Sequence, residues 1–241
     1  MAAFELAIES GADGIEFDVR LTCDEIPVVI HDETLQRTAG VTKRIADHTY
    51  DELQSFDVGS WFRRKFPTSS RDFSGETIPA LKSLLQWALG NSAKLYLEMK
   101  SDASRRQALA ESVCSLLSDF NIRERVVIEC FDLEAIKIVK ALDSKLKTAA
   151  LFEPSIATPP RLRSRRLIEL AKASSADEIA LHHRLVNRRI VEQAHAENLA
   201  TVVWTVDDPS WIDNARDLKL AAVITNRPRE LVDQRNRSAS S

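Results

Sequence analysis

The feature that most constrains the fold is a regular alternation, from residue 78 onward, of short apolar runs with amphipathic segments of helical period. The runs predict strands, and the segments between them predict helices of about ten to fifteen residues. Strands that alternate with such helices pair in parallel through right-handed crossovers. The predicted strands lie at residues 93–100, 125–131, 148–152, 178–182, 200–206 and 221–225.

Two architectures fit this alternation: a closed (β/α)8 barrel and an open doubly wound sheet. No Gly-x-Gly-x-x-Gly or Gly-x-x-x-x-Gly-Lys motif follows a predicted strand, so the nucleotide-binding signals of the open sheet are missing. The length of 241 residues and the succession of repeats favour the barrel. A strand at 14–19 brings the main strands to seven, with a hairpin at 27–32 beside it. We therefore expect a single α/β domain over residues 1–241, a TIM (β/α)8-type barrel that lacks its first strand.

Two segments stand outside the repeats. Residues 33–79 are rich in polar residues and turn formers, and they predict a small insertion after the first retained strand and its hairpin. This insertion contains a predicted helix at 50–56 and an aromatic cluster of Trp61, Phe62 and Phe66. Residues 233–241 are polar and Ser-rich, and we expect them to form a disordered tail.

Composition excludes several classes of partner. With 33 basic and 36 acidic residues, the net charge of -3 provides no positive field for nucleic acid or an anionic membrane. The isolated Cys23, Cys114 and Cys130 indicate a reducing compartment and no zinc or redox role. No apolar run approaches about 18 residues, and no secretion signal is visible. We expect a cytoplasmic protein without stable membrane insertion.

The run Gly14-Ile15-Glu16-Phe17-Asp18-Val19 suggests chemistry, because a strand here places both carboxylates on one face. Two neighbouring acids repel unless a cation lies between them, and His31 follows at the end of the next apolar run. Oxygen ligands with a nearby imidazole suit metal-assisted phosphoester chemistry. The alternative is a half-buried strand with a wet face. Polar residues gather instead at the carboxyl ends of predicted strands, where barrel active sites lie, and these are Glu16, Asp18, Glu98, Lys100, His182, His183 and Trp204.

Six motifs, in order, resemble the glycerophosphodiester phosphodiesterases, and the resemblance covers about residues 2–232. They are E-F-D-V at 16–19, P-V-V-I-H-D at 27–32, D-V-G-S-W-F at 57–62, E-T-I-P-A-L at 76–81, L-E-M-K at 97–100 and V-W-T-V at 203–206. The resemblance implies a TIM barrel that uses one divalent cation, Mg or Ca. It implies hydrolysis of small-molecule glycerophosphodiesters to glycerol 3-phosphate and an alcohol.

The resemblance also implies roles for individual residues. Glu16, Asp18 and Glu98 would hold the metal, His31 would be one of two acid/base histidines, and Lys100 would bind the substrate phosphate. Trp204, His182 and Phe152 would line the pocket. Lys100 and Glu98 are two apart on a predicted strand and so share a face, although a simple salt bridge between them is the alternative. For His31 the alternative is a hydrogen-bonded histidine at a strand end.

The chain also departs from the family pattern. The family begins with a strand ending in H-R-G, then P-E-N-T, and neither motif occurs in residues 1–241. With them the second histidine and a phosphate-binding arginine are missing, so we expect a truncated form of an active enzyme. Two alternatives are a non-catalytic relative that binds a metal or phosphodiester, and a barrel enzyme of another family that acts on phosphoinositides. Open strand edges predict a chain that is poorly soluble, forms a homo-oligomer or needs a preceding segment.

Overall fold

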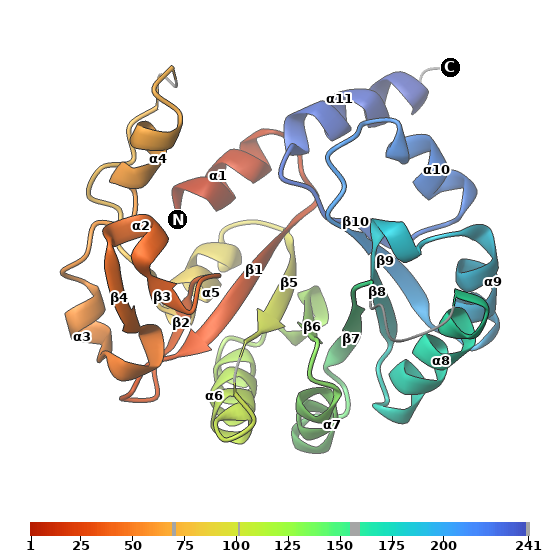
Figure 1. Cartoon of the computed structure of the whole chain (residues 1–241), viewed down its shortest axis with the longest axis horizontal. Coiled ribbons are helices and arrows are strands. Elements are labelled where there is room, and N and C mark those ends of the chain that lie inside the picture. Colours follow the sequence, from red (N-terminus) through yellow and green to blue (C-terminus); the bar gives the residue numbers. More distant parts are fainter. Residues whose placement is uncertain (69–70, 101, 155–159, 240–241) are drawn as a thin grey trace.

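A curved sheet forms the centre of the computed structural model, which we describe over residues 1–68, 71–100, 102–154 and 160–239 (Figure 1). Its strand order is β10-β9-β8-β7-β6-β5-β1-β2, with parallel pairing except between β1 and β2. The strands are β1 Gly14–Leu21, β2 Pro27–Val29, β5 Lys94–Met99, β6 Val126–Cys130, β7 Lys147–Phe152, β8 Glu178–His182, β9 Ala200–Trp204 and β10 Ala222–Val223. In the described residues β1 and β10 are not paired with each other, so the parallel sheet is an open TIM-type half-barrel, as the repeats predict.

Helices follow the strands and cover the outer face of the sheet (Figure 1). Local side chains begin some of them: Asp132 accepts a hydrogen bond from the Glu134 amide at the start of α7, and Asn187 does so from Ile190 at α9. No helix in the described part of the chain is long and apolar enough to cross a membrane. The helices are α1 Ala2–Glu9, α5 Leu81–Leu89, α6 Arg106–Asp119, α7 Leu133–Leu142, α8 Pro160–Ala173, α9 Arg188–Ala196, α10 Trp211–Asp217 and α11 Pro228–Ala239, with short 3-10 turns η2 Arg123–Arg125 and η3 His183–Leu185.

Each parallel strand sends alternate side chains to two different cores. The larger core lies between the sheet and the helices, and it contains residues such as Phe17, Leu97 and Ile128. The inner core on the concave face is smaller and contains Tyr96, Val127, Ala149, Leu151, Ala180 and Val202. Because successive strand residues point to opposite faces, the inner set continues toward the carboxyl ends as Glu98, Glu129 and Trp204.

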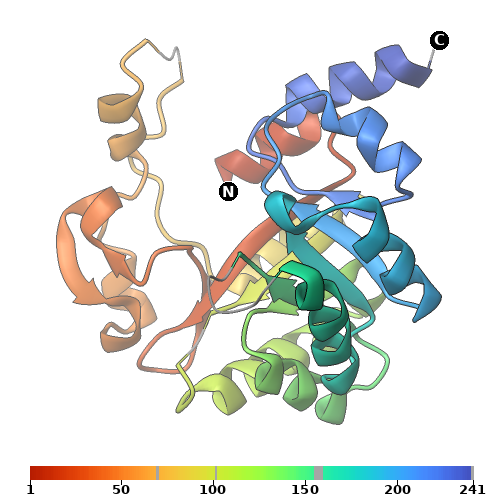
Figure 2. The ribbon, with the colours of Figure 1, turned by 45° about the vertical axis from the view of Figure 1, so that its right-hand side comes forward.

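Residues 33–68 and 71–79 form a lobe beside β1 and β2 (Figure 2). The lobe and β2 share a separate core of Val28, Leu35, Ile45, Leu53 and Ile78. The aromatic cluster forms, with ring centroids 4.8 Å apart for Phe62 and Phe66. Residues 69–70 of the predicted insertion lie outside the described residues. The lobe's elements are β3 Thr34–Leu35, α2 Gln36–Ala39, β4 Val41–Arg44, η1 Ile45–Asp47, α3 Tyr50–Leu53 and α4 Ser60–Lys65.

The structure corrects the prediction of a disordered tail from residue 233. Helix α11 continues to Ala239, and only residues 240–241 lie outside the described part. Arg235 explains the difference, because its guanidinium pairs with Asp13 and donates to the Gly11 carbonyl at 3.2 Å. Arg216 in turn donates to the Arg235 carbonyl at 2.8 Å. These contacts with distant segments order a stretch whose composition alone predicts disorder.

Replacing Gly14 tests the β1–β5 pairing. Gly14 lies opposite Lys94, and an added Cβ would come 2.5 Å from the Lys94 carbonyl oxygen. We expect Gly14→Ala to lower the free energy of unfolding by about 1–3 kcal/mol, because the strands must separate to admit the methyl group. Gly90→Ala is the matched control, since the nearest atom to its added Cβ would be the Trp87 carbonyl oxygen at 3.4 Å, and Gly90 has an ordinary helical backbone. Urea unfolding measures the free energy of unfolding of both variants. If the two variants were equally stable, the close packing of β1 on β5 would be contradicted.

Candidate functional site

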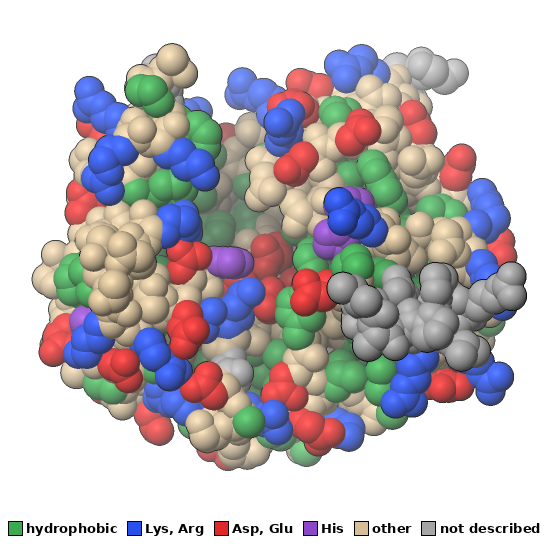
Figure 3. Space-filling view, in the orientation of Figure 1, with side chains coloured by type: hydrophobic (Ala, Val, Ile, Leu, Met, Phe, Trp, Pro, Cys, Tyr) green, Lys and Arg blue, Asp and Glu red, His purple; other side chains and the backbone are tan. Residues whose placement is uncertain are grey.

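A pocket opens on the concave side of the sheet at the carboxyl ends of the strands. Its free volume is about 280 Å³. In the space-filling view, acidic side chains form the floor of the central hollow and a histidine lies at its rim (Figure 3). The lining residues are Glu16, Asp18, His31, Glu98, Lys100, Glu129, Phe131, Leu151, Glu153, Trp204, Thr205 and Ile224.

Three carboxylates meet in this pocket. Glu16 and Asp18 project from β1, and register places Asp18 directly beside Glu98 of β5. One ligand oxygen from each of the three lies within 4.8 Å of the others. An all-oxygen set of this kind fits a hard divalent cation such as Mg²⁺ or Ca²⁺. The sequence prediction that these three side chains lie together is confirmed.

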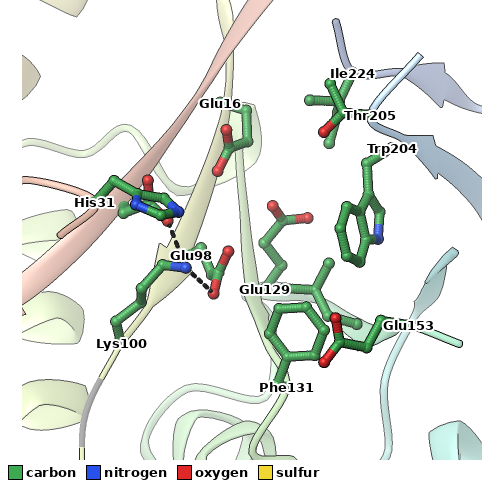
Figure 4. Close-up of a pocket in the computed structure, with 12 residues that line it drawn as sticks. Glu16, His31, Glu98, Lys100, Glu129, Phe131, Glu153, Trp204, Thr205 and Ile224 are labelled. Carbon is green, nitrogen blue, oxygen red and sulfur yellow. Dashed lines mark ion pairs between the residues drawn. The ribbon is translucent and has the colours of Figure 1, made fainter. Parts of the chain in front are cut away.

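Lys100 lies against two of these acids. Its Nζ is 3.1 Å from Asp18 Oδ1 and 3.0 Å from Glu98 Oε1 (Figure 4). Burial alone would lower the pKa of Lys100, but the two carboxylates outweigh burial and raise it. The ammonium therefore stays charged at neutral pH and offsets part of the negative charge in the pocket.

Two of the three carboxyls have raised pKa values. Burial, followed by the charges of Asp18 and Glu98, raises the pKa of Glu16 from 4.5 to about 8. Burial also raises the pKa of Glu98, although Lys100 opposes the shift. A divalent cation at this point would favour the ionised forms and lower the pKa of both carboxyls against the effect of burial.

His31 is held at the rim by its neighbours. Its Nδ1 is 2.8 Å from Asp32 Oδ1, and Asp32 Oδ2 accepts a hydrogen bond of 2.6 Å from Arg37. Burial would raise the pKa of Asp32, but the hydrogen bonds from Arg37 and His31 lower it. Arg20 donates to the His31 carbonyl at 3.0 Å. Nδ1 faces Asp32, and the other ring nitrogen of His31 has no hydrogen-bond partner among the described residues, so it can act in the pocket that His31 lines.

Two of the predicted lining residues lie elsewhere. Phe152 points to the outer face of β7 and belongs to the core between sheet and helices. Its neighbour Leu151 points to the concave face and lines the pocket. Strand parity places His182 on the concave side, but it is not among the lining residues; its ring packs edge-on against Trp204, with centroids 5.2 Å apart. Trp204 itself lines the pocket as predicted.

Sequence reasoning missed Glu129, Glu153 and Phe131, and it assigned no role to Asp32. Glu129 is only 2% exposed, and its Oε2 has no hydrogen-bond partner among the described residues. Burial, with added repulsion from Glu16, Glu98 and Asp18, raises the pKa of Glu129 well above 4.5. The available signal was an acid inside the apolar strand 126–130, one residue before its end.

Comparison with known proteins shows the family of this chain. The model of the glycerophosphoryl diester phosphodiesterase family matches residues 1–230. The chain belongs to this family. It is 29% identical over 235 residues to the glycerophosphodiester phosphodiesterase of Caldanaerobacter subterraneus, covering 97% of this chain and 90% of that protein. Identity to the glycerophosphodiester phosphodiesterase of Bacillus altitudinis is 28% over 233 residues, covering 95% and 88%.

Solved structures of phosphodiesterases share the fold. An Oleispira antarctica phosphodiesterase, in complex with the product sn-glycerol-3-phosphate, superposes with a TM-score of 0.83 at 22% identity, covering 98% of this chain and 90% of that one. The glycerophosphodiester phosphodiesterase of Agrobacterium tumefaciens superposes with a TM-score of 0.76 at 24% identity, covering 96% and 91%. These likenesses confirm the TIM-type barrel.

The strained carboxylates predict an unusual pH dependence of stability. Glu16 has a pKa of about 8 when folded and 4.5 as its ordinary value, so the folded state binds the extra proton between these limits. Without a divalent cation, stability should therefore fall as pH rises from 5 to 8, by at most about 1.4 kcal/mol per pH unit. Calorimetry should show that Ca²⁺ raises the Tm more at pH 8 than at pH 6. Glu16→Gln should flatten both trends, and a cation-free Tm that rises over this range would contradict the assignment.

Proposed function

We propose that this chain hydrolyses glycerophosphodiesters to glycerol 3-phosphate and an alcohol, using one divalent cation, Mg²⁺ or Ca²⁺, held by Glu16, Asp18 and Glu98. The observation that carries the proposal is the convergence of these three carboxylates with Lys100 in the pocket of a family member. The names of the relatives, and the product bound by the Oleispira antarctica protein, support this substrate class.

The reaction needs charge to be withdrawn from a phosphodiester anion and a proton to be moved. The cation, when bound, would draw electron density from the nonbridging oxygens. Lys100 lines the same pocket and can donate to one of these oxygens, which strengthens the attraction as charge develops there. The side chains of Phe131 and Trp204, whose ring centroids are 5.5 Å apart, form an aromatic wall on one side of the pocket.

His31 is the proposed proton carrier. With its Nδ1–H donated to Asp32, the imidazole presents a basic nitrogen that can take a proton from the attacking hydroxyl or return one to the leaving oxygen. Arg37 keeps Asp32 ionised and in place, so the His31 ring is oriented before substrate binds.

Substituting His31 tests this role. We expect His31→Ala to reduce the kcat for glycerol 3-phosphate release from glycerophosphocholine by about 100-fold or more, because general acid/base catalysis contributes this much. The Tm should change little, since the His31 side chain is 68% exposed. Asp32→Asn should lower kcat less and alter the pH profile. Full activity of His31→Ala would remove the residue from the mechanism.

Removing one carboxylate tests the cation site. Glu98→Gln should weaken Ca²⁺ or Mg²⁺ binding in a calorimetric titration by at least ~10-fold, because a charged ligand is lost from an all-oxygen set. Glu134→Gln is the control, as Glu134 pairs with Lys137 on the outside of α7. Equal cation affinities for the two variants would refute the proposed ligands.

The second candidate is a family member that binds a cation and a phosphodiester without turnover. It is favoured by one observation: among the described lining residues, His31 is the sole histidine, while the resemblance implies two. Cation-dependent binding of glycerol 3-phosphate, with no release of it from glycerophosphodiesters, would select this function. A preference for inositol-containing substrates would instead favour phosphoinositide chemistry. The cytoplasmic location, the absence of a nucleic-acid partner and homo-oligomer formation stay predictions.

A further inference from the structure

We propose that Glu129 is a specificity-determining residue that binds the terminal hydroxyl, the 1-hydroxyl, of the glycerol moiety. This inference rests on the proposed function, because it assigns the part of the pocket that recognises the substrate beyond its phosphate. Glu129 is neither one of the three proposed cation ligands, Glu16, Asp18 and Glu98, nor the proposed proton carrier.

The carboxyl of Glu129 is buried and directed into the pocket (Figure 4). Its Oε2 has no hydrogen-bond partner among the described residues, although Glu129 is only 2% exposed. A buried carboxyl oxygen without a hydrogen-bond partner is destabilising, so a bound group that satisfies it is expected. Glu129 therefore presents a ready hydrogen-bonding position to whatever occupies the pocket.

The position of Glu129 relates this group to the rest of the substrate. Register places Glu129 beside Glu98 on the next strand, β6. Lys100 lies on the other side of Glu98, against Asp18 of β1. If Lys100 holds the phosphate, the glycerol carbons extend across the three carboxylates toward β6. There Glu129 meets the hydroxyl farthest from the phosphate.

The surroundings favour a hydroxylated carbon chain over a second cation. Glu129 is not one of the acids whose oxygens lie within 4.8 Å of one another. The pocket wall beyond it is largely apolar, with Leu151, Trp204 and Ile224. Such a wall packs against C–H groups, while a carboxyl oxygen accepts from O–H. The free volume of about 280 Å³ also suits a three-carbon ligand.

The test compares two ligands that differ by one hydroxyl. Calorimetry with Mg²⁺, and again with Ca²⁺, gives the Kd of glycerol 3-phosphate and of its 1-deoxy analogue, 1,2-propanediol phosphate, for the full chain. The wild type should prefer glycerol 3-phosphate by at least ~10-fold, because a site built to bind a hydroxyl discriminates against its loss. Glu129→Leu and Glu129→Ala should each reduce this preference to within about twofold, whereas Glu129→Gln, which can still bond a hydroxyl, should retain most of it.

Glu153→Gln is the matched control, since Glu153 is an exposed acid in the lining of the same pocket and should leave the preference unchanged. The inference is overturned if the wild type does not discriminate, if the Leu and Ala variants discriminate as well as the wild type, or if they lose cation binding instead. Turnover separates this result from the proposed function. A chain that discriminates but releases no glycerol 3-phosphate supports Glu129 and refutes hydrolysis, whereas turnover without discrimination does the reverse.

Discussion

The pairing of β1 with β5 is the constraint on which the site depends. It sets Asp18 beside Glu98, and Lys100 follows two residues later on the same face. Without a cation these acids repel: burial first, and then the charges of Asp18 and Glu98, raise the pKa of Glu16, and the Lys100 ammonium offsets this only in part. The sheet must therefore hold like charges together against their repulsion, and the apolar packing behind β1 and β5 supplies that force.

The same strand positions the proton carrier. After β1 the chain turns back as β2, and the Ile30 amide donates to the Asp18 carbonyl at 2.9 Å. Arg20, also on β1, donates to the His31 carbonyl at 3.0 Å. His31 is thus attached to the backbone of a metal-ligand candidate, while its ring is oriented by Asp32 and Arg37. Cation and imidazole positions are linked through the hairpin, although the ring lies at an exposed rim.

Strand periodicity explains what the sequence could and could not predict. The alternating strands and helices, and the three acids that meet, follow from local patterns in residues 14–19 and 93–100. Placing Phe152 in the pocket ignored parity, since Leu151 and Glu153 share the face of Ala149. Parity applied to 126–131 would also have found Glu129. The order of α11 could not be found in this way, because Arg235 and Asp13 are 222 residues apart in sequence.

The deeper layer of the concave face differs from the layer of Glu129 in how its buried polar groups are hydrogen-bonded. Below it, Tyr96 donates to Glu178 Oε2 at 3.0 Å, so two buried polar groups satisfy each other across the inner core. Burial raises the pKa of Glu178 even so, while the Tyr96 hydrogen bond opposes the shift. Buried polar groups are normally paired in this manner. One layer up, Glu129 Oε2 has no hydrogen-bond partner among the described residues. A hydroxylated ligand in the pocket would supply the missing partner, so the layer at the strand ends can bind a ligand while the Tyr96–Glu178 layer beneath it satisfies itself.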